Sequence, residues 1–273
     1  MENILFGFIG CGNMGGALAA AACKGAGGSV LLANRTAAKA EALAARLGCT
    51  AGSNEEAAAR AKYLFLGVKP QMMGGMLAGI APVLAERAAR GERFVLVSMA
   101  AGLSMAAIAE MAGGSYPVLR IMPNTPAAVG AGMILATRNE RVTDAELEEF
   151  LRGMAAAGRF DLLDESLIDA GSAVAGCGPA FACLFLEALA DGGVACGLPR
   201  AKAQEYAAQM LLGTAALALE TGQHPGAMKD AVCSPAGSTI RGVQALEEGA
   251  FRGDVMRAVC AAFEKTRQLG ESK

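Results

Sequence analysis

Short apolar stretches alternate with alanine-rich helical patterns through the first 160 residues of the chain. The apolar stretches are rich in branched and aromatic side chains and predict strands at 4–9, 29–34, 63–68, 94–98 and 117–122. Helical periodicity between them predicts helices at 14–24, 37–47, 55–61, 71–90 and 104–111. Such alternation predicts an α/β fold with a doubly wound, mostly parallel sheet.

The pattern changes near residue 164. Two further strands are expected at 133–137 and 159–163, on either side of a helix that begins after Thr143. Beyond that point strand signals stop, and helices are broken at 176–179, 197–199, 222–225 and 234–237. The sequence therefore predicts a dinucleotide-binding domain at 1–164 and an all-helical domain at 165–273.

A glycine pattern follows the first strand and opens the first helix. Gly10, Gly12 and Gly15 form a Gly-x-Gly-x-x-Gly motif, with Asn13 and Met14 inside it. In a Rossmann-type fold the first glycine makes the turn, the second admits the pyrophosphate, and the third packs helix on strand. We expect all five residues to contribute to a cofactor site.

The end of the second strand bears on cofactor choice. It reads Asn34-Arg35-Thr36 and lacks the acidic residue that grips a free ribose 2′-hydroxyl. Arg35 can pair with a 2′-phosphate, so NADPH is expected and NADH is the less favoured cofactor. The alternative is a solvated arginine at a helix start.

Composition narrows the class of protein. Over 273 residues, 53% are hydrophobic and the net charge is −2, which predicts a substantial core and opposes a nucleic-acid partner. Eight cysteines without a Cys-x-x-Cys pair and a single histidine predict no metal site and free thiols in a cytoplasmic protein. The uncharged run 3–23 is punctuated by glycines, so we expect a strand, turn and helix there and no membrane segment.

A second anion site is indicated near the C-terminal end. Residues 234–239, Ser-Pro-Ala-Gly-Ser-Thr, place hydroxyls and unpaired amides at a helix start, where a small carboxylate can bind. The alternative is a helix cap with Pro235 in the first turn. If the loop needs positive φ at Ala236, alanine costs ~1 kcal/mol relative to glycine.

Together these motifs resemble the pyrroline-5-carboxylate reductase family, and the resemblance covers nearly the whole chain. Ser-Pro-Gly-Gly-x-Thr is the usual family form of 234–239, so Ala236 departs from it, as Cys177 departs from the usual serine before Gly178. The remaining matches are the glycine motif, Asn34, Asn54, Val68-Lys69-Pro70-Gln71, 98–102, 120–126, 178–181 and His224-Pro225.

The resemblance implies reduction of 1-pyrroline-5-carboxylate to L-proline, by hydride transfer from NADPH to the imine carbon. It implies that the adenosine end of the cofactor is held by Asn34, Arg35, Thr36 and Asn54. Loops at strand ends are expected to line the rest of the cofactor crevice through Val68, Lys69, Pro70, Ala100 and Asn124. The substrate is expected to be surrounded by Ser234, Gly237, Ser238 and Thr239, with Thr239 orienting the imine ring.

Two other functions fit parts of the sequence. A β-hydroxyacid dehydrogenase shares the nucleotide domain followed by helices, but it needs a proton donor, and residues 160–199 contain no Lys, Arg or His. A non-catalytic nicotinamide-nucleotide sensor shares the fold but has no need for a second anion site. An alanine-rich helical domain cannot bury its apolar faces alone, so we expect a homodimer through it and leave assembly of dimers into larger oligomers open.

Overall fold

The computed structural model describes residues 4–271. It divides into two compact units, one formed by the chain up to residue 177 together with the segment from 262, and the other by 178–261. The first unit contains the whole sheet, and the second is helical.

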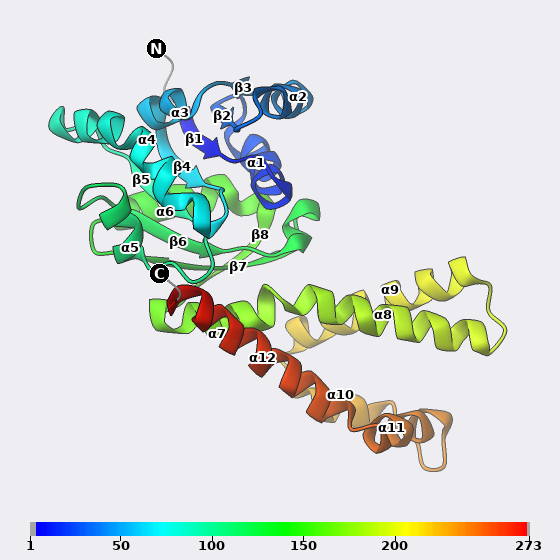
Figure 1. The fold of residues 1–273 in the computed structure, drawn as a ribbon. Helices are drawn as coiled ribbons and strands as arrows, with labels where there is room; N and C mark the ends of the chain where they lie inside the picture. The colour runs from blue at the N-terminus through cyan, green and yellow to red at the C-terminus, as the bar shows by residue number, and fades with distance from the viewer. Residues whose placement is uncertain (1–3, 272–273) are drawn as a thin grey trace. The chain divides into compact units, whose positions relative to one another are not determined.

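The sheet has eight strands in the order β3-β2-β1-β4-β5-β6-β7-β8 (Figure 1). Their bounds are β1 Ile4–Ile9, β2 Val30–Ala33, β3 Thr50–Ala51, β4 Ala61–Leu66, β5 Val95–Ser98, β6 Val118–Met122, β7 Gly132–Arg138 and β8 Gly158–Leu162. All neighbouring strands are parallel except β6 and β7. The expected doubly wound fold is confirmed, and the strand order reverses between β1 and β4, where ligands of such sheets bind.

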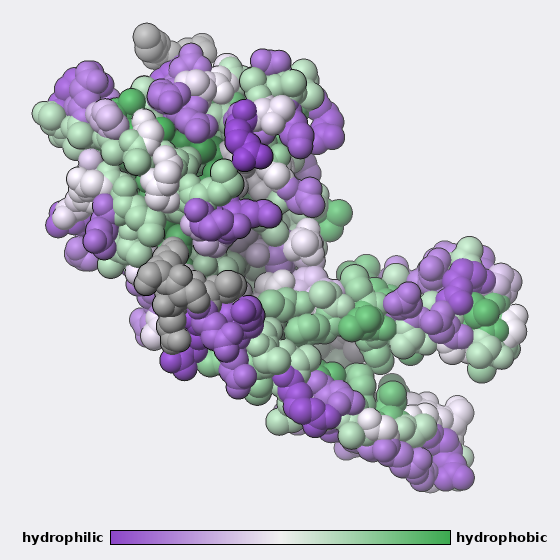
Figure 2. Space-filling view, viewed as in Figure 1, coloured by the Kyte–Doolittle hydropathy of each residue, from purple (hydrophilic) through white to green (hydrophobic). Residues whose placement is uncertain are grey.

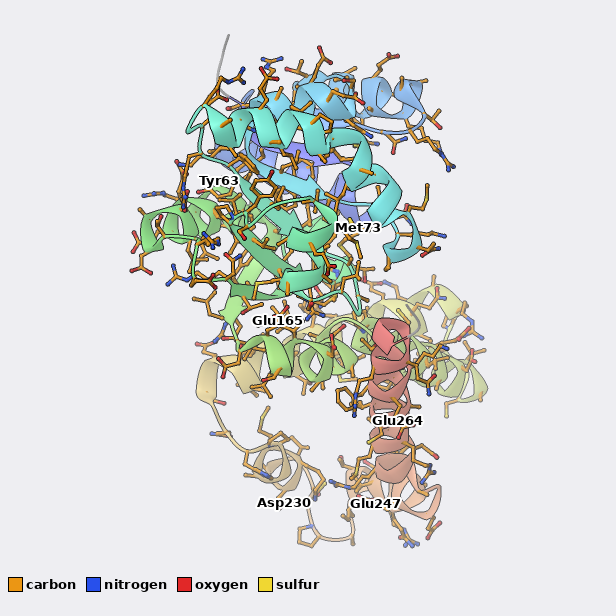
Figure 3. The ribbon with its side chains drawn as sticks, turned by 60° about the vertical axis from the view of Figure 1, so that its left-hand side comes forward. Tyr63, Met73, Glu165, Asp230, Glu247 and Glu264 are labelled. Carbon is orange, nitrogen blue, oxygen red and sulfur yellow. The ribbon has the colours of Figure 1, made fainter. Side chains whose placement is uncertain are left out.

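Helices cover both faces of this sheet. The helices of this region are α1 Asn13–Ala26, α2 Ala37–Leu47, α3 Asn54–Arg60, α4 Pro70–Ala89, α5 Met105–Met111 and α6 Asp144–Met154. One core cluster joins α1, α2 and α6 to a sheet face that includes Tyr63, and another joins α3, α4 and α5 to a face packed against Met73 (Figure 3). The central strands β1, β2, β4, β5 and β6 are mostly apolar, as expected of strands buried on both faces.

Helix α7, Glu165–Ala175, packs with the sheet. Its Ile168 lies in a small core cluster with Met122 and Leu135, and buried Arg120 pairs with Glu165 and Asp169. The boundary expected at residue 164 therefore lies one helix before the division between the compact units.

The remaining helices are α8 Gly178–Ala195, α9 Arg200–Thr221, α10 Pro225–Ala231, α11 Ser238–Glu248 and α12 Phe251–Glu271. All four expected breaks are confirmed, and α8 packs along α9 as an antiparallel pair (Figure 1). The sequence analysis missed the break between α11 and α12, where Gly249 is the C-cap of α11 and Ala250 has φ 57°, a conformation that normally favours glycine.

The helical unit leaves much apolar surface uncovered. Large exposed hydrophobic residues include Leu184, Leu212, Leu217 and Leu219, and Figure 2 shows apolar residues over α8. Among the described residues, 165–195 is a helical stretch long and apolar enough to cross a membrane, with only 11% of its most apolar window buried. Core helices of soluble proteins also pass that test, and the stretch is divided at 176–177, between α7 and α8.

Candidate active site

A cleft of about 1440 Å³ lies in the sheet unit, where β1, β2 and β4 end. This is the point at which the strand order reverses, since β1 lies between β2 and β4. Of the residues expected to bind the cofactor, nine line the cleft: Gly10, Gly12, Asn13, Asn34, Arg35, Thr36, Asn54, Val68 and Lys69. The structure therefore brings together residues spread over the first 69 positions of the chain.

The three motif glycines differ in how much space surrounds a Cβ at each position. Gly10 has φ +102°, and a Cβ there would lie 2.4 Å from the carbonyl oxygen of Gly67. A Cβ on Gly15 would lie 2.2 Å from the carbonyl oxygen of Gly10, so α1 packs closely on β1. A Cβ on Gly12 would meet nothing within 4 Å. Gly12 thus keeps open space in front of α1, whose start has no side-chain cap and no acidic residue in its first turn.

Asn34 links the two loops beside the cleft. Its Oδ1 accepts a hydrogen bond from the Cys11 amide at 3.1 Å, and its Nδ2 donates to the carbonyl of Thr36 at 3.1 Å. The side chain therefore fixes the shape of both loops, while Arg35 and Thr36 remain exposed at the cleft wall. Asn54 follows Ser53, which caps α3 in a reciprocal pair with Glu56.

The cleft is electropositive. Four cationic residues line it, Arg35, Lys39, Arg46 and Lys69, and no Asp or Glu is among the lining residues. None of these four forms an ion pair within residues 4–271. Sequence reasoning missed Lys39 and Arg46, although their spacing of seven residues places them on one face of α2. The cleft suits a ligand that carries several phosphate charges.

Five of the expected cofactor residues are not among the lining residues. Met14 and Ala100 pack in the two core clusters, Gly15 lies against the Gly10 carbonyl just after β1, and Pro70 begins α4. Asn124 is buried and hydrogen-bonded at both polar atoms: Oδ1 accepts from the Met133 amide and Nδ2 donates to the Ala175 carbonyl, both at 3.0 Å. In this structure Asn124 holds its loop to α7.

The loop expected to hold a carboxylate lies in the helical unit. Residues 234–237 form a turn closed by a hydrogen bond from the Gly237 amide to the Ser234 carbonyl at 3.0 Å, with φ 61° at Ala236. The helix start expected here is confirmed, since α11 begins at Ser238 with Gly237 as its N-cap and no side-chain cap. Ser234, Ser238 and Thr239 are exposed.

One detail of that loop corrects the sequence analysis. The Gly237 amide donates within the turn, so it is not free for an anion, which leaves the amides of Ser238 and Thr239 at the helix start. Gly237 packs closely on Ser234, because a Cβ at 237 would lie 2.4 Å from Ser234 Oγ and would require that hydroxyl to move.

The cysteines and acidic residues offer no competing chemistry in the described part of the chain. No group of three or more His, Cys, Asp or Glu side chains there could hold a metal ion. Cys11 lines the cleft, but burial and the neighbouring Cys49 raise the pKa of its thiol to about 11. The Cys11 thiol is therefore protonated at neutral pH and is a poor nucleophile.

Comparison with known proteins gives one consistent result. Residues 165–269 match the family model for pyrroline-5-carboxylate reductase dimerisation, and residues 5–102 match that for NADP oxidoreductase, coenzyme F420-dependent. The chain is 38% identical to a pyrroline-5-carboxylate reductase of Escherichia coli, over 97% of this chain and 98% of that protein. It is 36% identical to the Pisum sativum protein of the same name, over 98% and 97% of the two chains.

Solved structures agree with these relatives. A Plasmodium falciparum pyrroline carboxylate reductase with NADP bound superposes with a TM-score of 0.87 at 31% identity, covering 99% of each chain. A 1-pyrroline-5-carboxylate reductase of Streptococcus pyogenes superposes with a TM-score of 0.86 at 29% identity, covering 96% of this chain and 98% of that one.

Proposed function

This chain belongs to the pyrroline-5-carboxylate reductase family, and from that premise we propose that it reduces 1-pyrroline-5-carboxylate to L-proline with NADPH. The observation that carries the proposal is the presence of two anion-binding features in one chain. One is a cation-lined cleft at the switch point of the sheet, and the other is the uncapped start of α11.

The cleft fits the phosphate groups of a dinucleotide. Gly12 leaves room for a pyrophosphate at the start of α1. Arg35 lines the cleft at a position where an acidic residue would repel a 2′-phosphate, and its positive charge would instead attract one. The adenosine end would be held by Asn34, Arg35, Thr36 and Asn54, and Val68 and Lys69 also line the cleft. When bound, the reduced nicotinamide supplies the hydride.

The start of α11 would hold the substrate carboxylate. The amides of Ser238 and Thr239 lie at the positive end of the helix dipole, and the hydroxyls of Ser234 and Ser238 are exposed beside them. Thr239 would orient the imine ring through its hydroxyl. A protonated imine is already electrophilic, so the protein needs mainly to align the reactants and exclude water. This explains why the reaction requires no acid-base pair of side chains.

The two alternatives have less support. Reduction of a carbonyl by a β-hydroxyacid dehydrogenase requires a proton donor for the developing alkoxide, and residues 160–199 contain no Lys, Arg or His. A nucleotide sensor has no use for the exposed amides and hydroxyls at the start of α11.

We also propose that the chain forms a homodimer through its helical region and works in the cytoplasm. The family model matched by 165–269 describes dimerisation, and the apolar residues exposed on α9 supply the surface. A cytoplasmic location is supported by the cysteines, all eight of which are free thiols, as is usual in a reducing compartment.

The test is oxidation of NADPH on adding 1-pyrroline-5-carboxylate, compared with oxidation of NADH and with product identified as L-proline. We expect a higher kcat/KM with NADPH. In a Thr239→Ala variant, kcat/KM for the imine should fall about tenfold or more, with NADPH affinity nearly unchanged. Absence of imine-dependent oxidation with either cofactor would contradict the proposal.

A further inference from the structure

Lys39 occupies a position that stability does not explain. It lies in the first turn of α2, two residues after that helix begins at Ala37, and no acidic residue is present in that turn. A cation there is opposed by the positive end of the helix dipole. Lys39 is also exposed, and no ion pair of Lys39 is present within residues 4–271. Its side chain lines the cleft that Arg35 also lines.

We propose that Lys39 is a second specificity-determining residue for the 2′-phosphate of the cofactor, acting together with Arg35. This inference rests on the proposed function, because it assigns a role within the proposed cofactor site. The two cations stand four residues apart on either side of the N-cap Thr36, at the end of β2. A phosphate monoester carries a charge of about −1.5 to −2 at neutral pH, so a single arginine leaves part of that charge unpaired.

Arg46 provides a contrast on the same helix. It also lines the cleft, but it lies in the last turn of α2, where the helix dipole favours a cation. Seven residues separate it from Lys39, a distance of roughly 10 Å along the helix axis. Helix stability is sufficient to explain a cation at position 46. Because Arg46 lies far from the end of β2, Arg46→Gln is a matched control that also removes one positive charge from the cleft wall.

The experiment measures equilibrium binding of NADP⁺ and NAD⁺ by titration calorimetry to the full chain and to Lys39→Gln, Lys39→Arg and Arg46→Gln variants. Lys39→Gln should weaken NADP⁺ binding about tenfold to a hundredfold, the effect of losing one charge-assisted contact, and should change NAD⁺ binding less than about twofold. Lys39→Arg should retain most of the preference for NADP⁺. Arg46→Gln should leave the ratio of the two affinities at the parent value.

Adenosine 2′,5′-bisphosphate and ADP, used as competitors, separate the 2′-phosphate from the rest of the cofactor. Only the bisphosphate should lose affinity in Lys39→Gln. Equal weakening of both competitors, or an equal effect of Lys39→Gln and Arg46→Gln on the ratio, would overturn the inference. These binding measurements do not depend on turnover. If Lys39→Gln loses the NADP⁺ preference but the parent does not reduce the imine, the proposed function fails and the role of Lys39 stands.

Discussion

Ala236 holds a left-handed backbone, φ 61°, as the third residue of the turn 234–237. Turns of this kind favour glycine at that position, because the Cβ of an L-residue is sterically crowded in the left-handed conformation. Ala236→Gly should therefore raise the free energy of unfolding by about 0.5 to 1 kcal/mol, after the greater freedom of glycine in the unfolded chain is deducted. Urea unfolding of the two proteins measures the difference.

Ala245→Gly is the matched control, since Ala245 lies inside α11. The same exchange should there lower the free energy of unfolding by about 1 kcal/mol. A loss of stability in Ala236→Gly comparable with that in Ala245→Gly would show that position 236 carries no backbone strain.

At individual positions, prediction from sequence succeeded where the backbone alone decides the role. Gly10 and Gly15 have local geometries that exclude a Cβ, as the motif requires, whereas the role of Gly12 beside a pyrophosphate stays a prediction. Sequence could not show the direction of a side chain that depends on packing: the Asn124 side chain bonds to Met133 and Ala175, and its role in the cofactor site stays a prediction. Lys39 was missed because nothing in its neighbouring residues shows that α2 borders the cleft.

Among the elements, α3, α4 and β4 are joined by the buried side chain of Arg87. Its Nη1 donates to the carbonyls of Ala58 at 2.6 Å and Ala61 at 2.9 Å, and its guanidinium lies 4.9 Å from the ring centre of Phe94. Arg87→Met would leave two buried carbonyls without these partners, at a cost of about 1 to 3 kcal/mol for each unsatisfied group. We expect the free energy of unfolding to fall by about 2 to 4 kcal/mol in urea titrations.

Arg90, at the same end of α4, is the control residue for the stability measurement on Arg87. It pairs with Glu86 and Glu92, but its side chain is 52% exposed. Arg90→Met should therefore change the free energy of unfolding by less than about 1 kcal/mol. If the two variants lose equal stability, the carbonyl contacts of Arg87 do not hold these elements together.

The hydrogen bonds of Glu146, near the start of α6, predict that the free energy of unfolding depends on pH. Burial would raise the pKa of Glu146, but hydrogen bonds from Arg93, at 2.8 Å and 2.9 Å, and from the Thr143 amide outweigh burial and hold that pKa below its usual value. A carboxylate with a lowered pKa stabilises the folded state above its usual pKa, and this contribution is lost as the pH falls through the folded-state pKa. The free energy of unfolding should therefore fall below about pH 4.5, and less steeply in Glu146→Gln.

Chemical unfolding at a series of pH values between about 3 and 7 measures this slope. Glu148→Gln is the control, because Glu148 is an exposed residue of the same helix and should leave the slope of the parent unchanged. An identical slope in Glu146→Gln and the parent would contradict the role of the Arg93 pair.

Secondary structure was predictable where periodicity extends over several turns or a buried strand. Helix α2 spans Ala37–Leu47, as the pattern indicated. Strand β3 was missed because Thr50–Ala51 is too short to show a pattern. The end of α11 was missed although Gly249 is its C-cap, because a single glycine between two helical patterns does not by itself end a helix.

At the scale of the whole molecule, the exposed apolar side chains of α9 favour binding to a partner chain. The sequence predicted that the alanine-rich helical domain cannot bury its apolar faces alone, and the structure leaves Leu212, Leu217 and Leu219 exposed by 63%, 52% and 76%. Large apolar side chains that are exposed together on one helix favour a protein interface. The sequence alone left open whether Leu212 faces the core or the solvent, and the single chain places it at the surface.

Because Leu212 is exposed, Leu212→Glu should leave the fold of the single chain intact and act on assembly alone. A charge buried in an interface without a partner is costly, so we expect the variant to be monomeric at micromolar concentration, where the parent is a dimer. Sedimentation velocity measures the mass, and circular dichroism checks that the helices are retained. Leu162→Glu, which alters a 53% exposed leucine at the end of β8, should remain dimeric. A monomeric parent, or a dimeric Leu212→Glu protein, would show that the exposed face of α9 around Leu212 does not form the interface.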